Sequence, residues 1–155
     1  MGREEDDVAL AGGCRCGQCR YTLAYDAVPV TYACHCLDCQ TMTGSACTLH
    51  ALLPAERLSI EGDIIAWENR NSQGKLTSQR FCATCKTRLY STNEGRPGTV
   101  LLRMGTLDDS MRIVPAVHIW VRRKQFWVGL PADAETYEEG MPPERAKAVI
   151  GPNFA

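Results

Sequence analysis

The sequence predicts a mainly β domain with little helix, and three observations favour this class. Short runs of alternating or β-branched residues recur along the chain. Turn residues (Gly, Pro, Asn and Asp) separate these runs, and helical periodicity is weak throughout. At 155 residues, the chain suits one domain around one hydrophobic core.

Five strands and one helical turn are expected in the first half of the chain. Alternating residues predict a strand at 20–25, and β-prone residues around Pro29 predict another at 28–33. One helical turn is expected at 40–43, because Gly44 follows it. The run before Pro54 and the two short runs on either side of Gly62 predict strands at 47–53, 58–60 and 64–67.

The second half repeats this pattern and then changes in composition. Turn and loop residues separate further strand candidates at 76–81, 88–92, 100–104, 117–121 and 125–128. After Pro131 the chain becomes acidic, and a short helix is expected at 144–150. We therefore expect three parts: a flexible acidic tail at 1–9, a β domain at 10–130 and a C-terminal extension at 131–155.

Charge and hydropathy exclude several classes of protein. The net charge of -1 and a pI near 6.3 argue against a nucleic-acid partner, and we interpret the short basic run 122–124 as a solvated patch. No apolar run approaches the roughly 20 residues of a membrane span. Because no apolar export signal opens the chain, we expect a cytoplasmic protein, in which nine cysteines serve as metal ligands or functional thiols.

Two cysteine pairs far apart in sequence predict one metal site. Cys14 and Cys16 form a C-x-C pair flanked by glycines, and Cys82 and Cys85 form a C-x-x-C pair. Two such half-sites together give four thiolates, the ligand set of a structural zinc. A thioredoxin-like redox motif at Cys82 and Cys85 would need a βαβ context, which the sequence does not show.

A third cluster, Cys34, Cys36 and Cys39, is one ligand short of a closed tetrahedral zinc site. One interpretation is a second structural zinc completed by another residue, for which Cys19 and Cys47 stay open. His35 is disfavoured, because adjacent residues in an extended segment point to opposite faces. The other interpretation is an open zinc that keeps one position for water or a thiol.

Other candidate residues are weaker. His118 lies in an apolar run and is more simply a packed core residue than a ligand. Asp108 and Asp109 are compatible with acid–base work, but a turn explains them as well. We therefore assign no acid–base residue, and His118 and Asp108 are the first to test.

Five ordered motifs carry a resemblance to a known family: the glycine-flanked C-x-C at 12–17, C-H-C-L-D-C at 34–39, R-F-C-A-T-C at 80–85, G-T-L-D-D at 105–109 and P-A-V-H-I-W at 115–120. Over roughly residues 10–130, this sequence resembles the glutathione-dependent formaldehyde-activating enzymes, a family that also contains centromere protein V. The resemblance implies a β-tent of small antiparallel sheets stapled by zinc. It also implies that Cys14, Cys16, Cys82 and Cys85 hold the structural zinc, and that Cys34, Cys36 and Cys39 hold a second, catalytic-type zinc.

The resemblance further implies a zinc-dependent carbon–sulfur lyase-like activity, in which glutathione and formaldehyde condense to S-hydroxymethylglutathione. The expected partner is then a small thiol, most simply glutathione, rather than nucleic acid or a membrane. Three residues depart from the family pattern: Cys19 stands where an aliphatic residue is usual, Lys86 where Gly is common and Ser110 where Pro is common. The alternative is a non-enzymatic, zinc-stabilised binding module for a thiol ligand or a protein partner.

Overall fold

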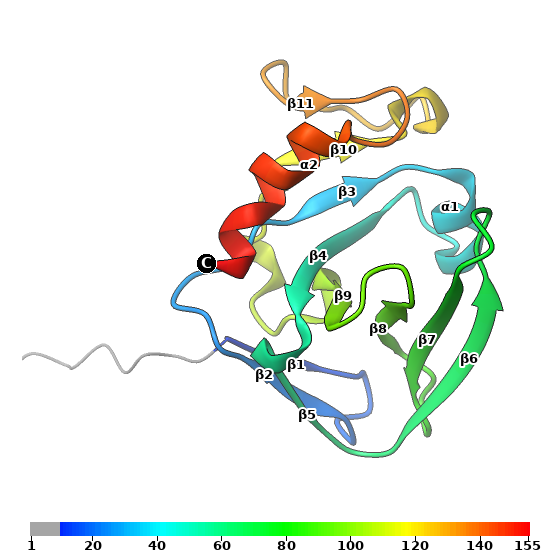
Figure 1. The fold of residues 1–155 in the computed structure, drawn as a ribbon, viewed down its shortest axis with the longest axis vertical. Helices are drawn as coiled ribbons and strands as arrows, with labels where there is room; N and C mark the ends of the chain where they lie inside the picture. The colour runs from blue at the N-terminus through cyan, green and yellow to red at the C-terminus, as the bar shows by residue number, and fades with distance from the viewer. Residues whose placement is uncertain (1–9) are drawn as a thin grey trace, which may run out of the picture.

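The computed structural model describes residues 10–155 and is mainly β, with two sheets and two short α-helices (Figure 1). The smaller sheet has the strand order β1–β2–β5 and is entirely antiparallel. Its strands are β1 (Leu10–Gly13), β2 (Arg20–Leu23) and β5 (Leu58–Glu61).

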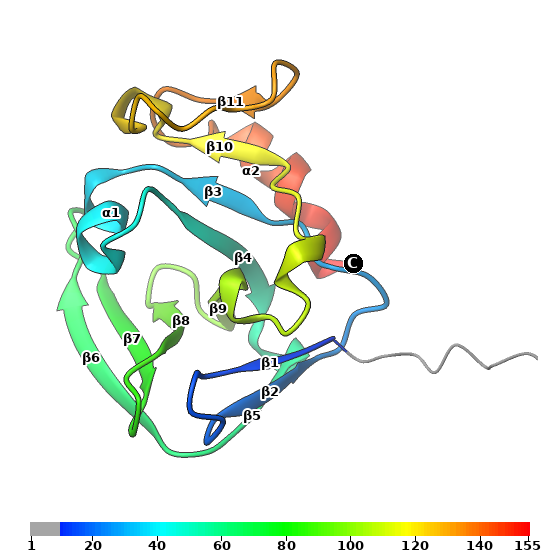
Figure 2. The same ribbon diagram turned by 180° about the vertical axis from the view of Figure 1, so that it is seen from behind.

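The larger sheet has eight strands in the order β11–β10–β3–β4–β9–β8–β7–β6. It curves round the body, so that β6 and β7 stand at one side and β10 and β11 at the other (Figures 1 and 2). Its strands are β3 (Tyr32–Cys34), β4 (Thr48–Pro54), β6 (Ile64–Arg70), β7 (Leu76–Cys82), β8 (Arg88–Asn93), β9 (Thr99–Arg103), β10 (Val117–Ile119) and β11 (Glu135–Thr136).

Helices are confined to connections and to the C-terminal part. The two α-helices are α1 (Leu37–Thr43) and α2 (Pro143–Ile150). Five single turns of 3₁₀-helix complete the set: η1 (Ala55–Arg57), η2 (Met104–Thr106), η3 (Ser110–Arg112), η4 (Val121–Arg123) and η5 (Gly151–Phe154). None of the helices in residues 10–155 has the length and apolar character needed to cross a membrane.

Alternate residues of β1, β2, β4, β8 and β9 point inward and build one core between the sheets. Tyr21, Leu23, Leu53, Leu89 and Leu102 are among its fully buried side chains. Gly12 on β1 faces its strand partner Tyr21 on β2 so closely that an added Cβ would lie 2.3 Å from the hydroxyl of Tyr21. Only glycine therefore fits at that position.

One buried asparagine ties the C-terminus to this core. Asn153 is 2% exposed, and its amide accepts from the backbone N–H of Val30 at 2.7 Å. The same amide donates to the carbonyls of Val30 and Leu52. The Tyr25 hydroxyl donates to the backbone carbonyl of Asn153. The C-terminal segment is thus hydrogen bonded into the end of β4.

The mainly β class, the antiparallel sheets and the small amount of helix are confirmed. The expected strand at 125–128 is wrong, because these residues form a turn in which the backbone N–H of Val128 donates to the carbonyl of Gln125. The Lys124 ammonium donates to the backbone carbonyls of Gln125 and Val128. The strand expected at 117–121 ends at Ile119, because Trp120 takes a left-handed conformation with φ 58°.

Other differences concern boundaries and pairing. Strand structure within 28–33 begins only at Tyr32, after Pro29. Helix α1 starts at Leu37, three residues before the expected turn. The sequence did not predict strands β1 and β11. It also did not predict that β10 pairs in parallel with β3 and with β11. Each of these features depends on partners distant in sequence. The expected tail at 1–9 lies outside the described residues.

Candidate metal centres

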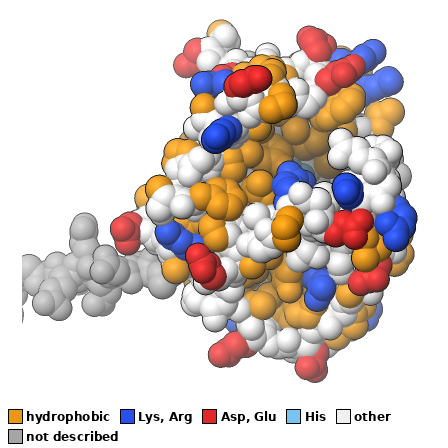
Figure 3. Space-filling view, viewed as in Figure 1, with side chains coloured by type: hydrophobic (Ala, Val, Ile, Leu, Met, Phe, Trp, Pro, Cys, Tyr) orange, Lys and Arg blue, Asp and Glu red, His pale blue; other side chains and the backbone are white. Residues whose placement is uncertain are grey.

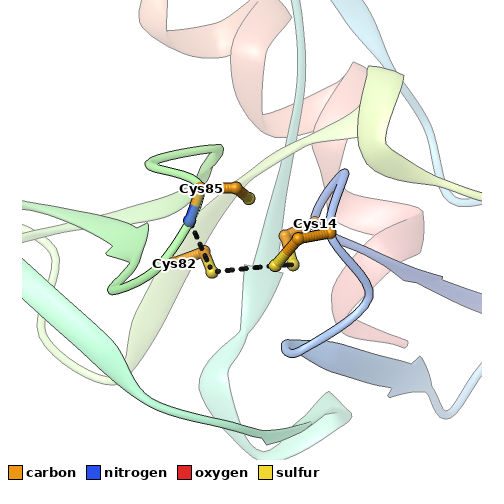
Figure 4. Close-up of side chains that lie close together, drawn as sticks. Cys14, Cys82 and Cys85 are labelled. Atoms are coloured by element: carbon orange, nitrogen blue, oxygen red, sulfur yellow. Dashed lines mark hydrogen bonds between the residues drawn. The ribbon is translucent and has the colours of Figure 1, made fainter.

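The four cysteines of the first cluster converge from two segments far apart in sequence, and Figure 4 shows Cys14 facing Cys82 and Cys85. Cys14 and Cys16 follow β1, whereas Cys82 ends β7 and Cys85 lies in the turn before β8. Their four Sγ atoms lie within 4.8 Å of one another, with 3.5 Å between Cys14 and Cys16 and 3.8 Å between Cys16 and Cys82. The cluster therefore connects the edge of the smaller sheet to the larger one.

Backbone N–H groups point at the sulfurs of this cluster. The Cys19 N–H donates to Cys14 Sγ at 3.2 Å, and the N–H groups of Thr84 and Cys85 donate to Cys82 Sγ at 3.4 Å. The Thr87 hydroxyl, the largest cause, lowers the pKa of Cys85 to about 5. Such bonds stabilise thiolates, the form in which cysteine binds metal.

Cys19 lies beside the first cluster and not the second. It is fully buried, and its thiol donates to the carbonyl of Asp63 at 3.4 Å. Burial, followed by contact with the Cys82 thiol, raises the pKa of Cys19 to about 12. The structure thus places Cys19 as a neutral thiol behind the ligands of the first cluster.

The second cluster is built by the junction of β3 and α1. Cys34 ends the strand, and Cys36 is the N-cap of the helix, where its sulfur accepts from the backbone N–H of Cys39 at 3.3 Å. The Sγ atoms of these three cysteines lie within 4.8 Å of one another, and the group consists of these three sulfurs alone among residues 10–155. Cys47 is half-buried nearby and does not join it.

Three thiols at this separation share protons unevenly. Hydrogen bonds from Cys34 and then Cys36 lower the pKa of Cys39 to about 3, and the Arg103 charge contributes in the same direction. The Cys36 thiol, as the largest cause, raises the pKa of Cys34. These contacts therefore favour the thiolate form at Cys39 and the thiol form at Cys34. Soft sulfur donors in both clusters fit a metal such as zinc, so the two clusters can hold metal ions.

His35 belongs to the opposite face of the large sheet. The pairing of β3 with β10 sets His118 against Ala33, and the His35 and His118 rings meet there, with 3.0 Å between Nε2 and Nδ1. Both rings line a largely apolar cavity of about 470 Å³ with Leu49 and Val128. As expected for adjacent residues, Cys34 and His35 diverge.

His50 and Thr48 face the cluster and were missed from the sequence. Strand pairing sets Thr48 against Cys34, and His50 against Tyr32 and Arg103. His50 Nε2 lies 3.9 Å from Cys39 Sγ and 2.5 Å from the Thr48 hydroxyl. Burial and then the Arg103 charge lower the pKa of His50 to about 3, so its ring is neutral. The i, i+2 spacing of Thr48 and His50 was the available signal.

A second cavity of about 680 Å³ adjoins this face. Thr48 and Arg103 link it to the cysteine cluster, and the other lining residues are Met42, Thr43, Cys47, Leu49, Trp67, Phe81, Lys86, Arg88 and Gly105. On the face of the molecule seen in Figure 1, hydrophobic side chains also gather in a hollow with basic side chains at its border (Figure 3). None of the three cysteines lines the 680 Å³ cavity itself.

The two aspartates do not pair with each other. The Arg20 guanidinium donates to both carboxylate oxygens of Asp108 and lowers its pKa. Asp109 pairs with Arg112 at 3.5 Å. Each carboxylate thus has a cationic partner of its own.

Comparisons with known proteins agree with the fold and the cysteine pattern. A family model described as glutathione-dependent formaldehyde-activating enzyme matches residues 9–123, well over half of the chain. A crystal structure of a Rhodobacter sphaeroides protein, solved in a structural genomics programme, shares the fold with a TM-score of 0.50 and 17% identity. That match covers 68% of this chain and 97% of the other. No curated protein matches. The chain belongs to the glutathione-dependent formaldehyde-activating enzyme family.

Proposed function

We propose that this protein is a zinc-dependent, carbon–sulfur lyase-like enzyme that acts on adducts of glutathione, or another small thiol, with a small electrophile such as formaldehyde. One observation carries the proposal: three cysteine sulfurs form a group to which no other residue of 10–155 adds a fourth ligand atom, next to a cavity of about 680 Å³. Membership of the family supports glutathione and formaldehyde as the reactants.

In this proposal the two clusters have different tasks. Cys14, Cys16, Cys82 and Cys85 supply four ligands and hold a structural zinc, which leaves no position for a substrate. Cys34, Cys36 and Cys39 supply three ligands and hold the catalytic-type zinc. When bound there, zinc would supply Lewis acidity that favours the thiolate form of a substrate thiol.

The surrounding residues would hold the site ready for addition. Helix α1 and β3 fix the three cysteines, and the buried Thr48 and neutral His50 lie beside Cys39 without adding charge. In the reaction, a sulfur–carbon bond forms as the carbonyl π bond breaks. The thiol proton ends on the new hydroxyl group, so the condensation is balanced without a redox partner.

Exchange spectroscopy by NMR tests the activity directly. Glutathione and formaldehyde are mixed with stoichiometric protein, and the rate of adduct formation is compared with that of the buffer. We expect acceleration by the protein, loss in Cys36→Ser, and retention in Cys47→Ser, the matched cysteine outside the cluster. A rate equal to that of buffer, for glutathione and for other small thiols, would refute the proposal.

The alternative function is a non-enzymatic, zinc-stabilised module that binds a thiol ligand or a protein partner. It is favoured by large apolar side chains that are almost fully exposed at Met111 and Phe126. Metal analysis with glutathione titration separates the two. A second zinc that glutathione contacts supports the enzyme, whereas two inert zinc sites support the module.

A further inference from the structure

Three cations line the cavity next to the three-cysteine cluster, and the described lining contains no carboxylate. They are Lys86, from the turn before β8, Arg88 on β8 and Arg103 at the end of β9. Among residues 10–155, none of the three forms an ion pair with Asp or Glu. Lys86 is exposed, but Arg88 and Arg103 are half-buried, and cations removed from water are normally paired, so the two arginines need a physical reason.

Two guanidinium nitrogens are buried without a hydrogen-bond partner. They are Nε of Arg88 and Nη1 of Arg103. Burial, and then the neighbouring Arg103 charge, lower the pKa of Arg88 to about 10, so the group is still charged at neutral pH. An orphaned buried N–H on a cation is costly, and an anionic acceptor would remove that cost.

Apolar contacts hold the Arg88 guanidinium in place. Its Cζ lies 5.2 Å from the centre of the Phe81 ring, and Nη1 lies 3.8 Å from Sδ of Met42. Phe81 and Met42 line the cavity together with Trp67. The charged head is therefore positioned against a wall that offers no counter-charge of its own.

The cysteine cluster does not balance these charges. Three thiolates and one divalent metal ion sum to -1, whereas Lys86, Arg88 and Arg103 sum to +3. The site would thus keep a charge of +2 with its metal bound. A ligand that brings a thiolate and a carboxylate would neutralise this excess.

We propose that Arg88 and Arg103, assisted by Lys86, form a subsite for the carboxylate of an anionic thiol, whose sulfur reaches the three-cysteine cluster. This inference rests on the proposed function for the thiol and on the cavity for the carboxylate. It identifies the residues that select a carboxylate-bearing thiol over a neutral one. Arginine suits this task because its planar fork matches both carboxylate oxygens.

Fluorescence of Trp67, which lines the cavity and is half-exposed, reports binding. The probes are glutathione, its diethyl ester, which lacks free carboxylates, and succinate, which lacks a thiol. A Trp67→Phe protein identifies the signal that comes from this residue. We expect glutathione to bind at least about tenfold more tightly than the ester, the loss typical of a charge-assisted hydrogen bond.

Variants test whether the two arginines cause the preference for glutathione over its ester. Arg88→Gln and Arg103→Gln should each weaken glutathione and succinate by about tenfold and leave the ester unchanged. Lysine at either position should restore part of the affinity, because the charge remains. Arg80→Gln is the matched control: Arg80 lies on β7 outside this cavity and donates to Ser78.

The outcomes separate a carboxylate subsite from two other cases. In one, the arginines only offset the negative charge of the cysteine cluster; in the other, the proposed function itself is wrong. Metal content and circular dichroism are recorded for every variant. Equal loss of glutathione and ester binding, together with loss of metal in Arg103→Gln, would overturn the subsite. Equal wild-type affinity for glutathione and its ester would overturn it too, while leaving thiol binding intact. Arginine-dependent binding of glutathione, together with an NMR exchange rate equal to that of buffer, would support the carboxylate subsite and refute the proposed function.

Discussion

Neighbouring residues at the end of β3 and just after it point to opposite faces of the large sheet. Cys34 and Thr48 lie on the face of the cysteine cluster, whereas His35 contacts His118 on the other. This separation excludes the histidine pair from the cluster and leaves His50 as the imidazole beside it. At the residue scale, side-chain alternation thus decides which groups share a site.

Asn153 is a buried polar residue whose replacement should lower the stability of the fold. Its amide makes three hydrogen bonds to the backbone of Val30 and Leu52 in a buried position. Asn153→Ala leaves those groups without partners, and we expect a loss of about 2 to 4 kcal/mol in the free energy of unfolding. Urea titration at fixed zinc measures this loss, with the exposed Gln73→Ala variant as a surface control. A change below about 0.5 kcal/mol would contradict the assignment.

Asp108 illustrates a candidate that the structure makes less attractive. Its carboxylate is half-exposed and paired with Arg20. Asp108→Asn should therefore change the free energy of unfolding by less than about 1 kcal/mol. We also expect the thiol–formaldehyde exchange rate to stay within about twofold of wild type, because no contact joins Asp108 to the three-cysteine cluster. A tenfold slower exchange at full zinc content would place Asp108 in the reaction.

At the scale of elements, the turn between β7 and β8 contributes residues to both the first cluster and the cavity. It presents Cys82 and Cys85 to the first cluster, and it also supplies Lys86 to the cavity. Lys86 takes a left-handed conformation with φ 62°, which non-glycine residues adopt at a cost of about 1 to 2 kcal/mol. The strain and the cation thus occur at the same residue.

Lys86→Gly should relieve the strain and remove the cation. Because glycine also loses more entropy on folding, we expect a net gain of up to about 1 kcal/mol in stability. Lys86→Ala removes the same charge but keeps the Cβ, so it should give no gain. Urea titrations compare the two. Equal stability of the glycine and alanine variants would show that the turn is not strained.

At the scale of the whole molecule, the first cluster bridges the edge of the smaller sheet and the β7–β8 turn. The proposed zinc at this cluster would couple metal binding to folding. We expect Cys82→Ala to lose zinc and cooperative unfolding, whereas Cys36→Ala should lose only the second zinc and keep the fold. Metal analysis and thermal circular dichroism test both. A Cys82→Ala protein with its fold and full zinc content would refute this assignment.

The sequence by itself determined the mainly β class, the family and the grouping of cysteines, because strand alternation and ligand spacing are local properties. The sequence also predicted a strand at 125–128 that the structure does not contain, because a turn closed by the Lys124 side chain forms there. Only the tertiary structure decided that Cys19 lies behind the first cluster and that Cys47 stays outside the second. It alone also brought Arg88 and Arg103 to one cavity. The physical reason is that strand pairing between distant segments sets these neighbours, and no local pattern encodes that register.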